Sequence, residues 1–212
     1  MARMNVNPTR MELNRLKARL KTAVRGHKLL KDKTDEMIRR FTVLIRENRR
    51  LRLKIEGEVA GVLTQFAVAR SLMSKNDVEL AFSIPSVSME LDFDKGNIMN
   101  VGVPVLHLKS NRSANMYPYF YSDVTSEADE SVRLCSKMMD DLIRLAEVEK
   151  SANMLAEEIE KSKRRVNALE YVLIPDLNET IKYITMKLEE NDRSSRTRLM
   201  KVKSMLAEKK DV

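Results

Sequence analysis

Apolar residues recur at alternating steps of three and four along the first quarter of the chain. The repeat begins at Leu13 and stays in register to Ile55. A seven-residue repeat sustained over this length is typical of a coiled coil rather than of a helix in a globular domain. Because no proline occurs between Pro8 and Pro85, the pattern predicts one helix over about residues 9–72, roughly 90 to 100 Å long.

A second repeat occupies the C-terminal part of the chain, where Ser126 is the expected start of a helix. It runs from Leu145 to Leu173, steps by four twice, and continues from Ile184 to Leu206. Since neither repeat contains a glycine- or proline-rich break, the two predict an antiparallel two-helix coiled coil. Its last stretch is poor in large apolar residues, so we expect it to be loosely paired or held as a single helix by a partner.

Several seam positions depart from the apolar pattern. His27 and Asn48 are polar, and such residues sacrifice some stability to fix the register of paired helices. Gly57 and Gly61 lie where the first repeat takes two consecutive steps of four, which predicts a relaxed supercoil with a close approach or a bend. Pro175 lies in the corresponding slip of the second repeat, which predicts a kink or an overwound turn.

The segment between the repeats alternates apolar and polar residues with a period of two. Val87 to Phe93 follows this pattern, residues 94–97 are typical of a turn, and residues 98–108 can return as a second strand. We therefore expect a β-hairpin at the far end of the rod, followed by a loop over 109–125. The candidate hairpin residues are Met89, Leu91, Phe93, Lys95, Gly96, Ile98 and Val101.

These patterns define an all-α dominated fold: a long antiparallel coiled coil of the N- and C-terminal helices with a small mid-chain β-hairpin insert. We expect residues 1–74 to form the N-terminal helix, 75–125 the insert that is the foot of the rod, and 126–212 the C-terminal helix. The three segments are predicted to make one continuous structural unit.

The composition argues against a compact enzyme, and the charge is unevenly distributed. Only 5 Gly, 5 Phe, 5 Tyr and no Trp occur in 212 residues, so turns and bulky core residues are few. Residues 1–54 hold 17 Lys and Arg against 5 Asp and Glu, residues 55–181 hold 13 against 21, and residues 182–212 hold 9 against 5. In an antiparallel pair both basic ends lie together, which predicts an acidic partner.

The single Cys135 and the absence of an apolar leader after Arg3 predict a reducing, intracellular setting. No apolar run reaches 18 residues, so any membrane role is expected to act through partners. No phosphate-binding loop or dinucleotide fingerprint occurs. His27 and His107, the only histidines, have no second ligand at metal-binding spacing. We therefore expect no catalytic residues, no cofactor and no metal.

Two separated motifs resemble one known family. Residues 7–10 (Asn-Pro-Thr-Arg), the run 13–20 and residues 26–33 resemble the start of the D subunit of the V-type and A-type rotary ATPases. Residues 164–171, followed by Ile174-Pro175, resemble that family's second signature. The resemblance covers essentially the whole chain, although the middle insert is similar mainly in its position.

The resemblance implies a non-catalytic central rotor shaft. Its paired helices would turn inside a ring of catalytic and regulatory subunits, where ATP is hydrolysed or made. Its other end would bind a small rotor companion subunit and a funnel-shaped subunit on the membrane ion ring. Such a shaft would couple ATP chemistry to proton or sodium transport, in the cytoplasm and peripheral to the membrane.

Basic clusters are the candidate contacts with such a ring. A solvated flank of the coiled coil is the simpler interpretation of any one residue, but the basic excess of the first helix favours contact with a partner. The alternative function is a basic coiled-coil adaptor for nucleic acid or an anionic surface; against it, the basic helices lack interleaved aromatic residues. The candidate contacts are Arg10, Arg15, Arg19, Lys21, Arg196, Arg198, Lys201 and Lys203, with a further basic cluster at Arg46, Arg49, Arg50, Arg52 and Lys54.

Overall fold

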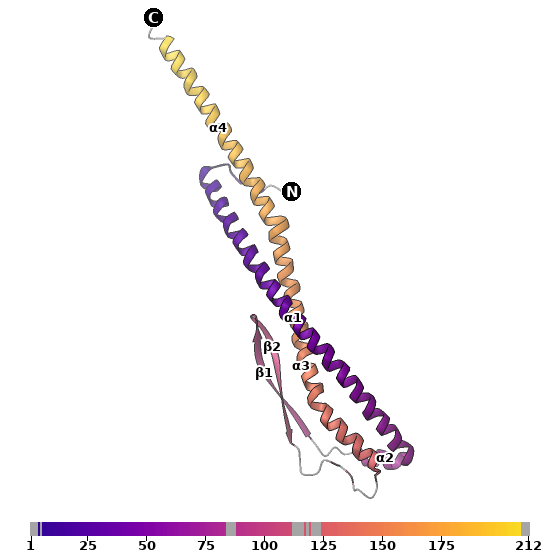
Figure 1. The fold of residues 1–212 in the computed structure, drawn as a ribbon. Helices are drawn as coiled ribbons and strands as arrows, with labels where there is room; N and C mark the ends of the chain where they lie inside the picture. The colour runs from indigo at the N-terminus through magenta and orange to yellow at the C-terminus, as the bar shows by residue number, and fades with distance from the viewer. Residues whose placement is uncertain are drawn as a thin grey trace. The chain divides into compact units, whose positions relative to one another are not determined.

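A computed structural model describes residues 4, 6–83, 88–111, 117, 119 and 124–208. The elements, in chain order, are α1 (Arg10–Leu72), α2 (Lys75–Ala81), β1 (Ser88–Ile98), β2 (Val101–Asn111), α3 (Ser126–Ala168), the π-helical turn η1 (Leu169–Leu173) and α4 (Ile174–Glu208) (Figure 1). This confirms the predicted class, two long helical segments with a β-hairpin between them. The chain forms two compact units: a first unit of Met1–Glu36 with Glu160–Val212, and a second unit of Met37–Ile159.

The first unit is an antiparallel pair made by the start of α1 and the segment from η1 into α4. Leu16 and Ala23 of α1 share a core with Leu177 and Ile184 of α4, and both α4 side chains are fully buried. At the flanks of this core, Arg10 contacts Asp192 and His27 contacts Glu170. The partner number falls as the α1 number rises, so the two segments run in opposite directions, as the seams predicted.

The slip in the second repeat is resolved by a π-helical turn, not by an overwound one. Leu169–Leu173 forms η1 directly before Ile174 and Pro175. A π turn closes hydrogen bonds from i to i+5, so it is wider than an α turn and takes up one extra residue. It lies where the proline would otherwise remove a hydrogen bond and clash with the preceding turn. Leu177 therefore still reaches the core after two steps of four.

The second unit pairs the rest of α1 with α3. Three cross-helix ion pairs join the two helices on their exposed flanks: Arg144 to Glu47 (2.8 Å), Arg52 to Glu149 (3.0 Å) and Lys54 to Asp141. Several of the predicted seam residues are buried on both helices. They include Met37, Leu51 and Ile55 of α1 and Val148, Ala152 and Leu155 of α3.

The close approach predicted at Gly57 and Gly61 is wrong. Apart from the neighbouring backbone of its own helix, a Cβ atom added to either glycine meets no atom of the described residues within 4 Å, and α1 continues as one helix of 63 residues through both positions. The two steps of four therefore shift the direction of the apolar seam without bringing another backbone against these glycines.

The hairpin turn lies later along the chain than predicted. β1 extends through Gly96 to Ile98, and the register pairs Ile98 with Val101 and Gly96 with Val103. The residues between the strands, Met99 and Asn100, both have positive φ, 56° and 68°. Such a two-residue turn matches the twist of a hairpin, and asparagine tolerates this conformation well. The glycine at 96, which suggested the turn, instead serves strand packing.

The hairpin tip lies against the helices of the second unit. Val101 and Val103 are buried with Leu155 of α3, and Phe41 and Leu44 of α1 pack against the same cluster. Away from the tip, a hollow of about 650 Å³ separates the strands from the helices, and the backbone N–H of Leu106 donates to Glu147 at 3.4 Å. Figure 1 shows the hairpin running beside α3. The tip is thus part of the apolar core of this unit.

A short helix that the periodicity did not predict follows α1. Ser74 caps α2, because its hydroxyl accepts from the backbone N–H of Asp77 at 3.3 Å, but seven residues are too few to show a repeat.

Aromatic contacts join Phe66 to Phe82 and Phe82 to Tyr119, with ring centroids 5.7 Å apart in both pairs. The loop predicted over 109–125 falls largely outside the described residues, and the proposed division at 74/75 and 125/126 stays a prediction.

The two glycines of the hairpin provide a matched test of this packing. A Cβ at Gly96 would lie 2.9 Å from a methyl carbon of Val105, whereas one at Gly102 meets nothing within 4 Å. We expect Gly96→Ala to destabilise the hairpin by about 1 to 3 kcal/mol through overpacking. Gly102→Ala should change stability by less than about 0.5 kcal/mol. Hydrogen exchange of the hairpin amides measures both, and equal protection in the two variants would contradict the register.

Candidate interaction surface

The C-terminal part of α4 extends past the start of α1. Arg10 is the first residue of α1, and it pairs with Asp192 of α4 at 3.0 Å. We call residues 193–208 the α4 overhang; at 1.5 Å per residue it is about 24 Å long. Every side chain described from residue 189 to residue 206 is exposed. Figure 1 shows this end of α4 continuing beyond the first turn of α1.

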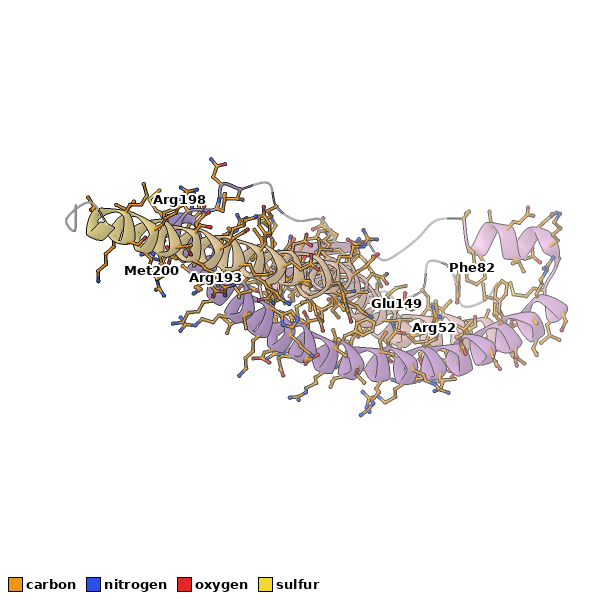
Figure 2. All side chains as sticks on the ribbon, turned by 90° about the horizontal axis from the view of Figure 1, so that it is seen from above. Arg52, Phe82, Glu149, Arg193, Arg198 and Met200 are labelled. Carbon is orange, nitrogen blue, oxygen red and sulfur yellow. The ribbon has the colours of Figure 1, made fainter. Side chains whose placement is uncertain are left out.

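The α4 overhang combines an apolar stripe with basic residues. Leu199, Val202 and Leu206 are spaced three and four apart, so they share one face of the helix, and they are 69%, 51% and 60% exposed. Figure 2 shows Arg193, Arg198 and Met200 on this part of α4. An apolar stripe of this kind, exposed on a helix with a net positive charge, is typical of a surface that a partner covers.

The predicted contact residues lie at the same end of the first unit but not in one patch. Arg196, Arg198, Lys201 and Lys203 are exposed on the α4 overhang. Arg10 joins α1 to α4 through Asp192, while Arg15 forms an ion pair with Glu12 of its own helix at 3.3 Å. The remaining α1 candidates, Arg19 and Lys21, are exposed beside the paired region. The candidates therefore form two sets, one on the helix pair and one on the single helix beyond it.

The second basic cluster of α1 is divided by the structure. Arg52 and Lys54 reach across to carboxylates of α3, and Figure 2 shows Arg52 and Glu149 close together. The hydrogen bond to Asp141 raises the pKa of Lys54. Arg46, Arg49 and Arg50 are exposed and make no ion pair with any residue that the structure describes. Only part of this cluster is therefore available to a partner.

The polar seam residues differ in what they contact. His27 Nε2 lies 3.3 Å from a carboxylate oxygen of Glu170, so it links α1 to the π-helical turn. Asn48 is half-buried, and its side chain forms no hydrogen bond within the described ranges. The role of both in fixing helix register stays a prediction.

The hairpin candidates fall on two sides of the strands. Phe93 is 72% exposed, with Met89 and Leu91 partly exposed on the same face of β1, whereas Val101 is buried. Lys95 and Gly96 are strand residues, and Gly96 lies against Val105. The hairpin thus presents one apolar face to the surroundings and uses its tip to hold the helices.

Sequence reasoning expected the last stretch of the C-terminal helix to be loosely paired or held as a single helix by a partner, but its list of candidate contacts contained only basic residues. It placed Leu199, Val202 and Leu206 in the seam, although α1 starts too late to pair with them. The signal was present in the lengths of the two repeats, since the second extends further than the first can cover. The residues added to the candidate surface are Leu199, Met200, Val202, Met205 and Leu206.

Among the residues described, no helix is both long and apolar enough to cross a membrane. Within the same residues, no group of three or more His, Cys, Asp or Glu side chains is placed to hold a metal ion.

Comparisons with known proteins match nearly the whole chain. The family model for the D subunit of ATP synthase matches residues 12–204. The D subunit of a V-type ATP synthase from Thermoanaerobacter sp. is 52% identical over 206 residues, covering 97% of this chain and 99% of the relative. Its counterpart from Streptococcus pneumoniae is 54% identical over 203 residues, covering 96% and 100%. The one from Clostridium novyi is 51% identical over 214 residues, covering 100% and 99%.

Because the α4 overhang is exposed, we expect substitutions in it to have little effect on the stability of the chain. Replacing Leu199, Val202 and Leu206 together with Gln should leave the midpoint of thermal unfolding nearly unchanged, because these side chains contact no core. Ile184→Ala is the matched control: the isoleucine is fully buried, and its truncation should cost about 2 to 5 kcal/mol. Far-UV circular dichroism measures both. A large loss of stability in the triple Gln variant would show that the overhang is packed against the chain.

Proposed function

Because the chain belongs to the family of ATP synthase D subunits, which are central-stalk components of rotary ATPases, we propose that it is a non-catalytic shaft. It transmits torque between ATP hydrolysis or synthesis in a catalytic ring and proton or sodium transport in the membrane. The comparisons at 51–54% identity over almost the full length support the family assignment. The shaft needs no catalytic group of its own, since it acts through contacts that change as the ring subunits open and close.

The observation that carries this proposal is the α4 overhang. It is a single helix with exposed apolar and basic side chains, held at its base by an antiparallel pair whose core includes Leu16 and Ile184. A single helix presents different side chains around its circumference, so a ring subunit meets a different surface at each rotational position. The pair below it resists twisting because the two helices share buried side chains and ion pairs.

The proposed partners follow from the same assignment. The candidate basic residues at the start of α1 and on the α4 overhang contact the catalytic and regulatory subunits of the ring. The other end of the shaft binds a small rotor companion subunit and a funnel-shaped subunit that rests on the membrane ion ring. We place the chain on the cytoplasmic side of the membrane as a peripheral part of this complex.

The alternative function, a basic coiled-coil adaptor for nucleic acid or an anionic surface, receives no support. The matched relatives, which align with this chain over almost their whole length, are named as D subunits of V-type ATP synthases. The basic residues of the second unit that face α3 are also neutralised by carboxylates, which reduces the charge available to phosphates.

Single-molecule rotation tests the proposal directly. The chain is prepared as Cys135→Ser with Lys95→Cys, because Lys95 is exposed on β1; the complex is assembled, and a bead is attached through the new thiol. We expect stepwise rotation in one direction when ATP is added. Two results would contradict the proposed function as a shaft. The complex could hydrolyse ATP normally while the bead remains still, or the chain could fail to enter a complex.

Charge reversal tests the contribution of the paired helices. Arg15, Arg19 and Lys21 replaced together with Glu should weaken assembly with the catalytic ring by about tenfold or more at low salt, a change of about 1.4 kcal/mol or more. The effect should shrink as salt screens the charges. The control reverses Lys161, Lys163 and Arg165, three exposed basic residues of the same unit. Equal binding by both triple variants, with helicity intact, would argue against the α1 contacts.

A further inference from the structure

α1 carries a second apolar stripe in the second unit, separate from its buried seam. Ile38, Ile45 and Leu53 are 42%, 43% and 61% exposed, and Thr42 lies between the first two. The steps from 38 to 42, 45, 49 and 53 keep these positions on one side of a helix with 3.6 residues per turn. Ile38 and Ile45 each follow a seam residue, Met37 and Leu44, so this side lies about 100° around α1 from the seam.

Most of the stripe lies on a different side of α1 from the hairpin, although Ile38 and Ile45 are the helical neighbours of Phe41, which packs against the cluster of the hairpin tip. Leu44 and Glu47 line the hollow between the strands and the helices. Arg49 is two residues after Glu47, which places it about 160° around the helix from that position. Most of the α1 surface formed by Ile38, Thr42, Ile45, Arg49 and Leu53 is therefore not covered by the hairpin.

α3, the helix paired with α1, shows no such surface. No large apolar side chain is exposed on α3 over its described length, although α3 and the second half of α1 belong to the same unit. The exposed apolar side chains of the helix pair are thus concentrated on α1. Single exposed apolar residues are ordinary on proteins, but a periodic set on one helix of a pair indicates a surface that another molecule covers.

Positive charge accompanies the apolar stripe. Arg49 lies within it and Arg46 beside it; both are exposed, and neither forms an ion pair within the described segments. Their neighbours Arg52 and Lys54 are already neutralised by Glu149 and Asp141. Arg50, which is also exposed and without an ion pair among the described residues, lies about 100° around α1 from Arg49. Arg46 and Arg49 are therefore the unpaired charges at the stripe, and a molecule that covers the stripe needs carboxylates opposite these two residues.

We propose that Ile38, Thr42, Ile45, Arg49 and Leu53 form a docking face for an acidic helical segment of a partner protein in the same complex. The inference rests on the proposed function, because it places this partner within the rotary assembly. The helical spacing of the stripe fits apolar side chains of an antiparallel or parallel helix, and Arg46 and Arg49 pair with flanking Asp or Glu. A stripe one residue wide is too narrow to lie on lipid, and it contains no aromatic side chain for stacking on bases.

Protection of a single cysteine tests whether the face is covered. In a Cys135→Ser background, Thr42→Cys places a thiol in the stripe, and Val43→Cys places one on a different side of α1, about 100° away. Thr42 is exposed and Val43 is 62% exposed, so both thiols should react rapidly with maleimide in the free chain. In the assembled complex we expect Thr42→Cys to react at least about tenfold more slowly, with a much smaller change for Val43→Cys.

The possible results distinguish a failure of the proposed docking face from a failure of the proposed function as a shaft. If the complex forms and rotates but Thr42→Cys reacts as fast as in the free chain, the docking face is wrong and the proposed function stands. Equal protection at both positions would also overturn it, because α1 would then be enclosed on all sides. Protection in the free chain that grows with its concentration would show that a second copy covers the face. If the unmodified chain enters no complex, the proposed function fails and this inference fails with it.

Crosslinking and substitution identify the occupant. A photoreactive amino acid at Thr42 should crosslink in the complex to a peptide rich in Asp and Glu; crosslinks only to lipid or nucleic acid would overturn the proposal. Ile45→Asp combined with Arg49→Glu should increase the dissociation rate of that partner about tenfold or more. Val43→Asp, the matched control on the other side of α1, should leave it nearly unchanged, and an equal effect of both would contradict the assigned face.

Discussion

The lengthwise burial of one apolar stripe per helix is the interaction that holds this structure together. Each unit contains few bulky residues, so its core consists of side chains such as Leu16, Leu155 and Ile184 enclosed between antiparallel helices. Isolated helices gain little stability from their own hydrogen bonds in water, so α1 owes its 63-residue length to the partners that cover its seam. Where the partner ends, as at the α4 overhang, apolar side chains become exposed and available for another molecule.

Two local devices preserve this burial where the repeat is interrupted. The π-helical turn before Pro175 accommodates an extra residue and returns Leu177 to the core. The hairpin covers part of α1 and α3 with Val101 and Val103, which extends a core that two helices alone leave narrow. The ion pairs between α1 and α3 lie on exposed flanks, and exposed pairs contribute little to stability; they set which basic residues remain free for partners.

Much of the candidate surface could be predicted from residue type and spacing. The excess of basic residues at both ends of the chain can be counted in the sequence. The candidate basic residues of the C-terminal helix are exposed on α4 in the structure. The division of the basic cluster in α1 could not be predicted, because it depends on which carboxylates of α3 come opposite Arg52 and Lys54. The exposure of Leu199 and Leu206 likewise depends on where α1 begins relative to α4, a property of the pairing and not of either repeat.

Residue patterns alone were enough to establish the class of fold, where the long helices begin to within a residue or so, and the direction of their pairing. They were enough because heptad spacing, proline positions and caps act locally along a helix. The turn at Met99 and Asn100, the docking of the hairpin tip and the openness around Gly57 and Gly61 emerged only in the folded chain. These features depend on which side chains of different elements come into contact. Several strand registers are compatible with the same alternation of apolar and polar residues, and packing against the core determines which one forms.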